Sequence, residues 1–276
     1  MLEQELASAI AAVQRAGQVL LEVYATPFEV SWKGKSDPVT VADERANALI
    51  VAALREQFPS DGIIAEESPD HLSAISKRRI WYVDPLDGTK EFIAKNGEFS
   101  VMVGLAIDGE ARLGVVYQPT EDKLYTGIVG QGAWLVERGQ KTPLQVSEKS
   151  DPWTLGLVVS RSHRPKSTET LTRTLGITKE SVSGSVGLKV GLIAQQQADL
   201  YVHVSDKASA WDACGPEAVL RAAGGRFTDL LGQPFVYGTT ELRTTRGILA
   251  CNQAAFASVL PTVTEIGFSD GLLQRT

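Results

Sequence analysis

An apolar strand pattern that ends in two carboxylates and a tight turn constrains this chain more than any other feature. Residues 79–83 are rich in aromatic and β-branched side chains and predict a buried strand. Asp84 and Asp87 follow it, and Pro85 and Gly88 are expected to stop the regular ladder. The sequence therefore predicts two acids at the point where a strand opens into a loop.

Two carboxylates three residues apart can converge on a hard divalent cation, which is one chemical use of this pattern. The proline-fixed backbone would aim the Leu86 carbonyl at the same ion. Such a stretch fits a metal-assisted phosphoryl site. An ordinary Asx turn, in which Asp84 or Asp87 accepts a bond from a backbone amide two residues on, remains the alternative.

Two further acids are expected at the ends of elements. Glu66 follows the apolar pair at residues 63–64, and Asp212 precedes a helical segment predicted at residues 213–223. Taken alone, Glu66 reads as a solvated loop charge and Asp212 as a helix N-cap. Four acids at element ends, two of them beside Gly and Pro turns, fit an oxygen-only Mg²⁺ site better, because Mg²⁺ prefers carboxylate, carbonyl and water ligands.

Three segments resemble the signatures of the inositol monophosphatase superfamily of lithium-sensitive, Mg²⁺-dependent phosphatases. They are Glu66-Glu67-Ser68, Asp84-Pro85-Leu86-Asp87-Gly88-Thr89, and Trp211-Asp212 followed by Gly215. The resemblance covers most of the chain. Lys90-Glu91 replaces the Thr-Asn of typical inositol monophosphatases, and this makes the chain most similar to the 3'(2'),5'-bisphosphate nucleotidases of the superfamily, which remove the 3'-phosphate of 3'-phosphoadenosine 5'-phosphate.

The resemblance implies metal roles for particular residues. Glu66, Asp84 and the Leu86 carbonyl would hold a first Mg²⁺, and Asp84, Asp87 and Asp212 a second. A third, weaker ion would lean on Glu66. Two metals of this kind polarise the phosphoryl oxygens and activate a water, so no covalent phosphoenzyme is required.

Asp43, Glu66 and Thr89 are the catalytic residues that the resemblance implies. The Thr89 hydroxyl would link the attacking water to Asp43, and these groups with Glu66 would orient and deprotonate that water. Thr40 and Asp43 also have the spacing of a capping box before an apolar series of helical period. Asp43 can serve both as part of a capping box and as a catalytic residue.

Substrate contacts are expected from the motif and from the second half of the chain: Asp87, Gly88, Thr89, Ser162, His163, Lys189 and Asp212. Residues 160–163 follow a predicted strand and offer groups for a nucleotide's second phosphate or its ribose. Residues 184–189 open a helix that could meet an anion, although they depart from the commoner Gly-Ser-Ser-Leu-Lys pattern. A glycine-rich turn, a solvated Lys189 and a surface position for Arg161 and His163 are the alternatives.

Several other functions are compatible with parts of the pattern. Inositol-1-monophosphatase and fructose-1,6-bisphosphatase activities belong to the same superfamily. The 84–89 motif superficially resembles that of haloacid-dehalogenase-like phosphatases, but its spacing is one residue too long. A non-catalytic metal or nucleotide sensor would not need Asp43, Glu66 and Thr89 beside the ligands.

Composition and net charge limit the classes of partner and the cellular location that we expect. The chain has 276 residues, a formal net charge of −6, 43% hydrophobic residues and two cysteines without zinc-site spacing. The negative charge argues against a nucleic-acid polymer as partner, and no apolar run is long enough to span a membrane. We expect a cytoplasmic enzyme acting on a small phosphate monoester, with a homodimer left open.

The predicted fold is α/β (α+β), and the resemblance implies a layered α-β-α-β-α sandwich with the site between two halves. The polar stretch at residues 141–153 predicts the boundary between halves 1–150 and 151–276. Two helices should precede the first acidic loop, and antiparallel strands with a hairpin turn at Asp108-Gly109 should fill residues 100–136. Strands are then predicted at 155–159, 200–204 and 248–251, and helices at 166–175, 187–197 and 213–223.

Overall fold

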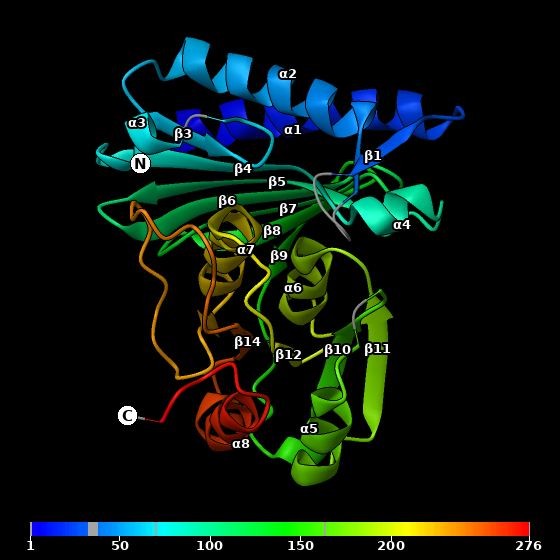
Figure 1. The fold of residues 1–276 in the computed structure, drawn as a ribbon, viewed down its shortest axis with the longest axis vertical. Coiled ribbons are helices and arrows are strands. Elements are labelled where there is room, and N and C mark those ends of the chain that lie inside the picture. Colours follow the sequence, from blue (N-terminus) through cyan, green and yellow to red (C-terminus); the bar gives the residue numbers. More distant parts are fainter. Residues whose placement is uncertain (1, 33–37, 70, 163, 276) are drawn as a thin grey trace.

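The computed structural model describes residues 2–32, 38–69, 71–162 and 164–275, and these form five layers. Two helices cover one face of a seven-stranded sheet, two more lie between that sheet and a five-stranded sheet, and a last pair covers the far side (Figure 1). This arrangement confirms the predicted α-β-α-β-α sandwich.

The seven-stranded sheet has the strand order β3-β4-β5-β6-β7-β8-β9. The β3–β4 pair is parallel, and every later pair is antiparallel. At the β5–β6 turn, Asp108 and Gly109 both have positive φ, as the hairpin prediction required. The strands are Gly62–Ala65 (β3), Arg79–Asp87 (β4), Ser100–Ile107 (β5), Glu110–Gln118 (β6), Lys123–Ile128 (β7), Gly132–Glu137 (β8) and Gln140–Leu144 (β9).

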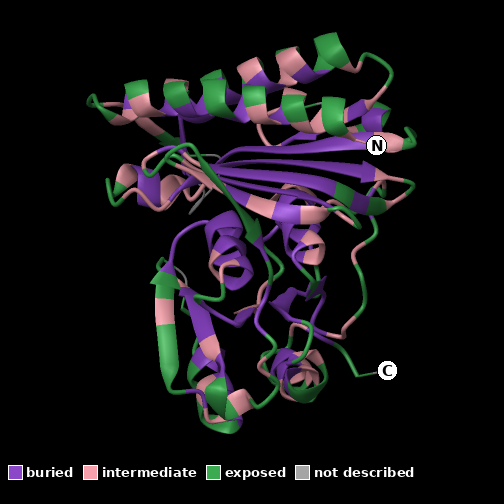
Figure 2. Ribbon diagram, turned by 180° about the vertical axis from the view of Figure 1, so that it is seen from behind, coloured by how far each residue is buried: buried purple, intermediate pink, exposed green. Residues whose placement is uncertain are grey.

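Helices α1 (Glu3–Tyr24) and α2 (Val41–Gln57) cover the outer face of this sheet. Each presents a buried apolar stripe to the strands and an exposed face to solvent, which Figure 2 shows from behind. The short elements near them are β1 (Val30–Trp32), β2 (Pro38–Thr40), α3 (Leu72–Ile75) and α4 (Thr89–Ile93).

The five-stranded sheet has the order β11-β10-β12-β14-β13. Helices α6 (Val186–Ala194) and α7 (Ala210–Ala222) lie between the two sheets, and α5 (Ser167–Leu175) and α8 (Phe256–Ser269) lie on the far side (Figure 1). The strands are Gly156–Ser160 (β10), Lys179–Ser183 (β11), Leu200–His203 (β12), Gly225–Thr228 (β13) and Ile248–Asn252 (β14), and a 3₁₀ turn covers Pro152–Thr154.

Helix α7 lies directly on the backbone of the seven-stranded sheet. A Cβ atom at Gly114 of β6 would stand 2.0 Å from the carbonyl oxygen of Gly215, and one at Gly104 of β5 would stand 2.5 Å from its nitrogen. Only glycine permits this approach. Because the first turn of α7 carries Asp212, the close contact fixes that residue against the sheet that carries Asp84.

The same helix buries a carboxylic acid that the site does not use. Glu217 is 1% exposed, accepts a hydrogen bond of 2.6 Å from the Tyr237 hydroxyl and pairs with Arg221 at 3.0 Å. Burial raises the pKa of Glu217 to about 7, and its hydrogen bond from Tyr237 and the charge of Arg221 oppose that rise.

The observed elements differ from the prediction in a few places. Strand β4 continues through Asp87, so the two acids lie on its irregular end rather than in a loop. Strand β9 includes Pro143, which is tolerated because β9 is an edge strand. The sequence pattern did not indicate β11, β13 or α8, whose interior contains Pro261. The division into halves at residue 150 stays a prediction.

Candidate active site

Three carboxylates converge in the lining of a pocket of about 680 Å³. Asp84 and Asp87 come from β4 and Asp212 from α7, and one oxygen of each lies within 4.8 Å of the others. The pocket walls come from both sides of the predicted boundary at residue 150. Asp212 lies 125 positions after Asp87 in the chain, and the sequence predicted that these acids meet.

The end of β4 aims its two acids through an interruption of the ladder. Pairing with β5 is regular up to Asp84, shifts register, and resumes at Asp87 opposite Ser100. Pro85 has no N–H to donate, which explains the interruption. The Leu86 amide donates to the Asp84 carboxylate at 3.0 Å, so the Asx turn is present. It coexists with the acid cluster and orients Asp84 within it.

Asp212 lies in the first turn of α7. The helix begins at Ala210, three residues earlier than predicted, so Ser209 is the N-cap and Asp212 is not. The Ser209 amide donates to the Asp212 carboxylate at 2.6 Å. This bond holds the carboxylate at the helix N-terminus, where negative charge is favoured.

The electrostatics of the cluster fit a divalent cation. Burial raises the pKa of Asp84 well above its usual value, and the charges of Glu66, Asp87 and Asp212 raise it further. Burial and the charges of Asp87 and Glu66 raise the pKa of Asp212 in the same way. A bound cation removes this repulsion. The oxygen-only donor set is the kind that Mg²⁺ prefers, so the residues present fit the ion.

Glu66 and Leu86 line the same pocket. The Glu66 amide donates to the Val83 carbonyl at 3.1 Å, which places Glu66 at the end of β3 beside the acidic end of β4. The tight three-carboxylate group does not include Glu66. The Leu86 carbonyl accepts a bond of 3.2 Å from the Thr89 hydroxyl.

Thr89 and Asp43 meet across the helix ends, as the resemblance implied. The Thr89 hydroxyl lies 3.4 Å from the Asp43 carboxylate. The other Asp43 oxygen accepts bonds of 2.7 Å from both the amide and the hydroxyl of Thr40, which completes the capping box of α2. Burial raises the pKa of Asp43 to about 6, and the Thr40 bonds oppose the rise. Asp43 therefore caps α2 and contacts Thr89 at the same time.

Ser185 holds Asp87 in place, a role that the sequence did not reveal. Its hydroxyl donates to the Asp87 carboxylate at 2.6 Å and accepts from the Leu188 amide at 3.1 Å. Ser100 lies 2.8 Å from the same hydroxyl and is the remaining donor. The Gly187 amide adds a second bond to Asp87 at 3.2 Å. One donor and two acceptor positions are all that a hydroxyl offers, so Ser185 has none left for a substrate.

Lys189 lines the pocket but is not a solvated lysine. It is 3% exposed, donates to the Gly184 carbonyl, and its ammonium lies 5.0 Å from the centre of the Tyr201 ring. Burial lowers the pKa of Lys189 to about 8, although nearby acids such as Asp87 act in the opposite direction. The helix and the glycine turn thus bury a cation beside the acid cluster.

Residues after β10 are held by two acids, Glu91 and Glu98. The Ser162 hydroxyl donates to Glu91 at 2.5 Å. Arg161 forms a two-pronged pair with Glu98 at 2.5 and 2.6 Å, and the Gly184 amide donates to the same carboxylate at 2.8 Å. Arg161 is exposed, while His163 lies outside the described residues.

Gly88 turns the chain between β4 and α4. Its φ is +96°, a conformation that side chains rarely adopt, and a Cβ atom there would stand 3.0 Å from the Glu98 carbonyl. Gly88 and Thr89 both line the pocket, and the turn that places them there requires glycine at position 88.

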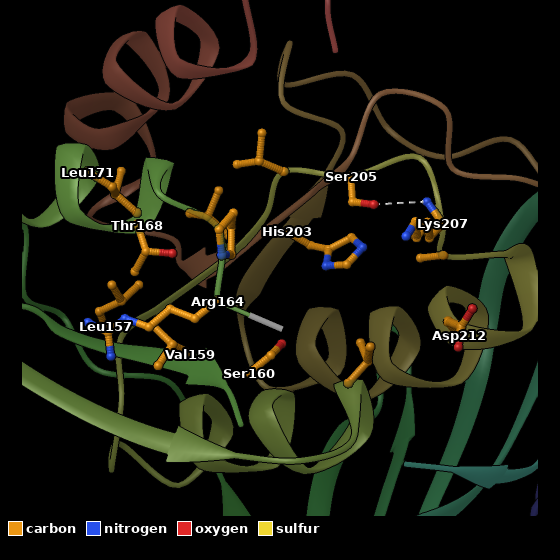
Figure 3. A pocket seen from close by; sticks show the side chains of 15 residues that line it. Leu157, Val159, Ser160, Arg164, Thr168, Leu171, His203, Ser205, Lys207 and Asp212 are labelled. Atoms are coloured by element: carbon orange, nitrogen blue, oxygen red, sulfur yellow. Dashed lines mark hydrogen bonds between the residues drawn. The ribbon is translucent and has the colours of Figure 1, made fainter. Parts of the chain in front are cut away.

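A second, largely apolar pocket of about 440 Å³ adjoins the first. Figure 3 shows Leu157, Val159 and Leu171 on one side of it and His203 and Lys207 toward the other. The two pockets share five lining residues: Ser160, Val186, His203, Lys207 and Asp212. A molecule bound at the acid cluster could therefore extend an apolar group into the second pocket.

Known proteins resemble this chain along most of its length. The model of the inositol monophosphatase family matches residues 1–266. The chain is 37% identical over 231 residues to the 3'(2'),5'-bisphosphate nucleotidase CysQ of Escherichia coli O157:H7, covering 83% of this chain and 92% of that one. It is 29% identical over 270 residues to mouse inositol monophosphatase 1, covering 94% and 93%.

Solved structures of similar proteins have the same fold. The crystal structure of CysQ from Bacteroides thetaiotaomicron matches with a TM-score of 0.76 and 28% identity, covering 91% of this chain and 97% of that one. An IMPase from Thermotoga maritima matches in fold with a TM-score of 0.81 and 23% identity, covering 98% and 100%. The chain therefore belongs to the inositol monophosphatase family.

Proposed function

We propose that this protein is a 3'(2'),5'-bisphosphate nucleotidase that removes the 3'-phosphate of 3'-phosphoadenosine 5'-phosphate with Mg²⁺. The observation that carries the proposal is the convergence of Asp84, Asp87 and Asp212 in one pocket beside Thr89 and Asp43. Relatives named as bisphosphate nucleotidases support the choice of reaction, at 37% identity for the example above.

Each residue has a role in this proposal. Glu66, Asp84 and the Leu86 carbonyl would hold one Mg²⁺, and Asp84, Asp87 and Asp212 a second, with a third ion beside Glu66. Bound Mg²⁺ would polarise the phosphoryl group and lower the pKa of the attacking water.

Thr89 and Asp43 act on the water. The Thr89 hydroxyl accepts a bond from the attacking water and donates its own proton to Asp43, and Glu66 takes part in deprotonating the water. The bonds from Thr40 leave one Asp43 oxygen for Thr89. Thr89 presently divides its single proton between Asp43 and the Leu86 carbonyl, and a cation on that carbonyl would favour Asp43.

A nucleotide fits the neighbouring pocket better than a polyol does. The apolar lining, which includes Leu157, Val159 and Leu171, suits a planar base but offers little to an inositol ring. Lys207 lines both pockets and supplies a positive charge for the second phosphate. Gly88 and Lys189 would contact the substrate at the reacting end.

Inositol 1-phosphate hydrolysis is the second candidate, since mouse inositol monophosphatase 1 is similar over 94% of this chain. Phosphate release with Mg²⁺ should be compared for 3'-phosphoadenosine 5'-phosphate, inositol 1-phosphate and fructose 1,6-bisphosphate. We expect the highest kcat/KM for the nucleotide and inhibition by Li⁺. A higher kcat/KM for either sugar phosphate would contradict the proposed substrate but leave the metal site in place.

The location of the enzyme, its class of substrate and its assembly are also proposals. No helix in the described ranges is long and apolar enough to cross a membrane. A cytoplasmic location, a small-molecule substrate rather than a nucleic-acid polymer, and a possible pairing of two copies stay predictions.

A further inference from the structure

The Glu91–Ser162 hydrogen bond joins two segments that line the active-site pocket. Glu91 belongs to α4, two residues after Thr89, and Ser162 follows β10. The two side chains meet at 2.5 Å although 71 positions separate them in sequence. Both line the pocket that holds the acid cluster.

The direction of this bond fixes what Ser162 can offer to a substrate. Glu91 is 5% exposed and, as a carboxylate, only accepts hydrogen bonds. The single proton of the Ser162 hydroxyl therefore points to Glu91, and the lone pairs of its oxygen are left for other partners. Ser162 is exposed, so those lone pairs are open to the pocket.

An acceptor at this position disfavours a phosphate group. Phosphate oxygens need donors, and Ser162 has already given its only proton to Glu91. The paired Glu98–Arg161 contact adds no free positive charge, because the guanidinium faces a carboxylate that also receives the Gly184 amide. The group that fits beside Ser162 is a hydrogen-bond donor without negative charge.

We propose that Glu91 is a positioning residue that fixes the Ser162 hydroxyl as an acceptor, and that Ser162 thereby recognises a ribose hydroxyl of the substrate. This inference rests on the proposed function. In 3'-phosphoadenosine 5'-phosphate the 2'-hydroxyl is the one free hydroxyl, and it lies next to the carbon that carries the reacting phosphate. Ser162 lines the catalytic pocket and not the apolar one, which favours the ribose over the amino group of the base.

The test compares two substrates that differ only in that hydroxyl. Wild-type kcat/KM for 3'-phosphoadenosine 5'-phosphate should exceed that for its 2'-deoxy analogue by about 3- to 10-fold, the range that one neutral hydrogen bond supplies. In Ser162→Ala the ratio should fall to about 1. Ser167→Ala is the matched control, because its buried hydroxyl in α5 has no hydrogen-bond partner among the described residues and should leave the ratio unchanged.

Glu91 variants separate positioning from general damage. Glu91→Ala should lower the ratio, and adding Ser162→Ala to it should lower the ratio no further than Ser162→Ala alone, because the two residues act through one bond. Glu91→Gln should retain most of the ratio, since its amide oxygen still accepts the Ser162 proton.

Two results would overturn the inference alone: a wild-type enzyme that hydrolyses both nucleotides equally well, or a Ser162→Ala variant that discriminates as the wild type does. A wild-type enzyme that hydrolyses neither nucleotide but does hydrolyse inositol 1-phosphate would instead refute the proposed function, and this inference with it.

Discussion

Ser185 should control metal affinity although its hydroxyl has no capacity left to touch metal or substrate. In Ser185→Ala, Asp87 loses the 2.6 Å bond from the hydroxyl and keeps only the longer 3.2 Å bond from the Gly187 amide. A hydrogen bond to a charged group contributes about 1.5–3 kcal/mol. If that energy holds Asp87 in its binding geometry, the Mg²⁺ Kd should rise by roughly 10- to 100-fold, which is the usual cost of removing a partner of a metal ligand.

Calorimetric titration of Mg²⁺ into the metal-free protein measures this change, and phosphate release at saturating Mg²⁺ should recover much of the wild-type kcat. Ser100→Ala is the control, because it removes a neutral donor to Ser185 and leaves the bond from Ser185 to Asp87 intact. Its Kd should rise by less, about 2- to 10-fold. Wild-type Mg²⁺ affinity in Ser185→Ala would refute the reasoning.

Four other substitutions test separate parts of the structure. Asp84→Asn should lose hydrolysis by losing Mg²⁺, whereas Thr89→Ala should lose turnover and bind Mg²⁺ normally; calorimetry on both variants separates these outcomes, and normal affinity in Asp84→Asn would contradict the ligand assignment. Because the folded pKa of Glu217 is raised from 4.5 to about 7, its contribution to stability is full below pH 4.5 and is lost as pH rises through 7. Relative to the wild type, Glu217→Gln should therefore gain about 3 kcal/mol in unfolding free energy between pH 4.5 and 8 in urea titrations, and parallel pH profiles would count against this. Gly88→Ala should cost about 1–2 kcal/mol of stability, measured by urea unfolding, because φ is +96° there, and an unchanged midpoint would show that the turn relaxes.

The acid cluster could be predicted because its signals are local. Asp84 and Asp87 follow a clear strand pattern, and the proline and glycine beside them mark the end of regular pairing. Thr40 and Asp43 have the spacing of a capping box, and the structure contains that box together with the contact to Thr89. Asp212 was grouped with these acids because it stands at the start of a predicted helix, and the resemblance then implied its place in the second metal site.

The supporting contacts could not be predicted because they join distant positions. A serine after a glycine fits an anion contact or a glycine-rich turn equally well, and only the structure shows that Ser185, at the start of α6, bonds Asp87 at the end of β4. Glu91 was noted only as part of the Lys90-Glu91 pair, and nothing in the sequence indicated that Glu91 and Glu98 each hold a residue after β10. Lys189 was predicted to contact the substrate, with a solvated lysine as the alternative, and its burial could not be predicted because sequence alone does not reveal that α6 lies between two sheets.

Secondary structure was hardest to predict where local preference and tertiary packing disagree. Strand β11 is polar and pairs on one side only, as a sheet edge allows. Helix α8 contains a proline that local rules disfavour, but its Val259, Val263 and Ile266 are buried in the outermost layer. The energy of that burial offsets the lost backbone bond.

The most direct single measurement is phosphate release from 3'-phosphoadenosine 5'-phosphate by the wild-type protein after its divalent ions are removed by chelation and Mg²⁺ is added back. We predict no release from the metal-free protein and a saturable return of activity with Mg²⁺, yielding adenosine 5'-phosphate. Undiminished release after chelation would contradict a catalytic cation at Asp84, Asp87 and Asp212, and no release at any Mg²⁺ concentration would contradict the nucleotidase function.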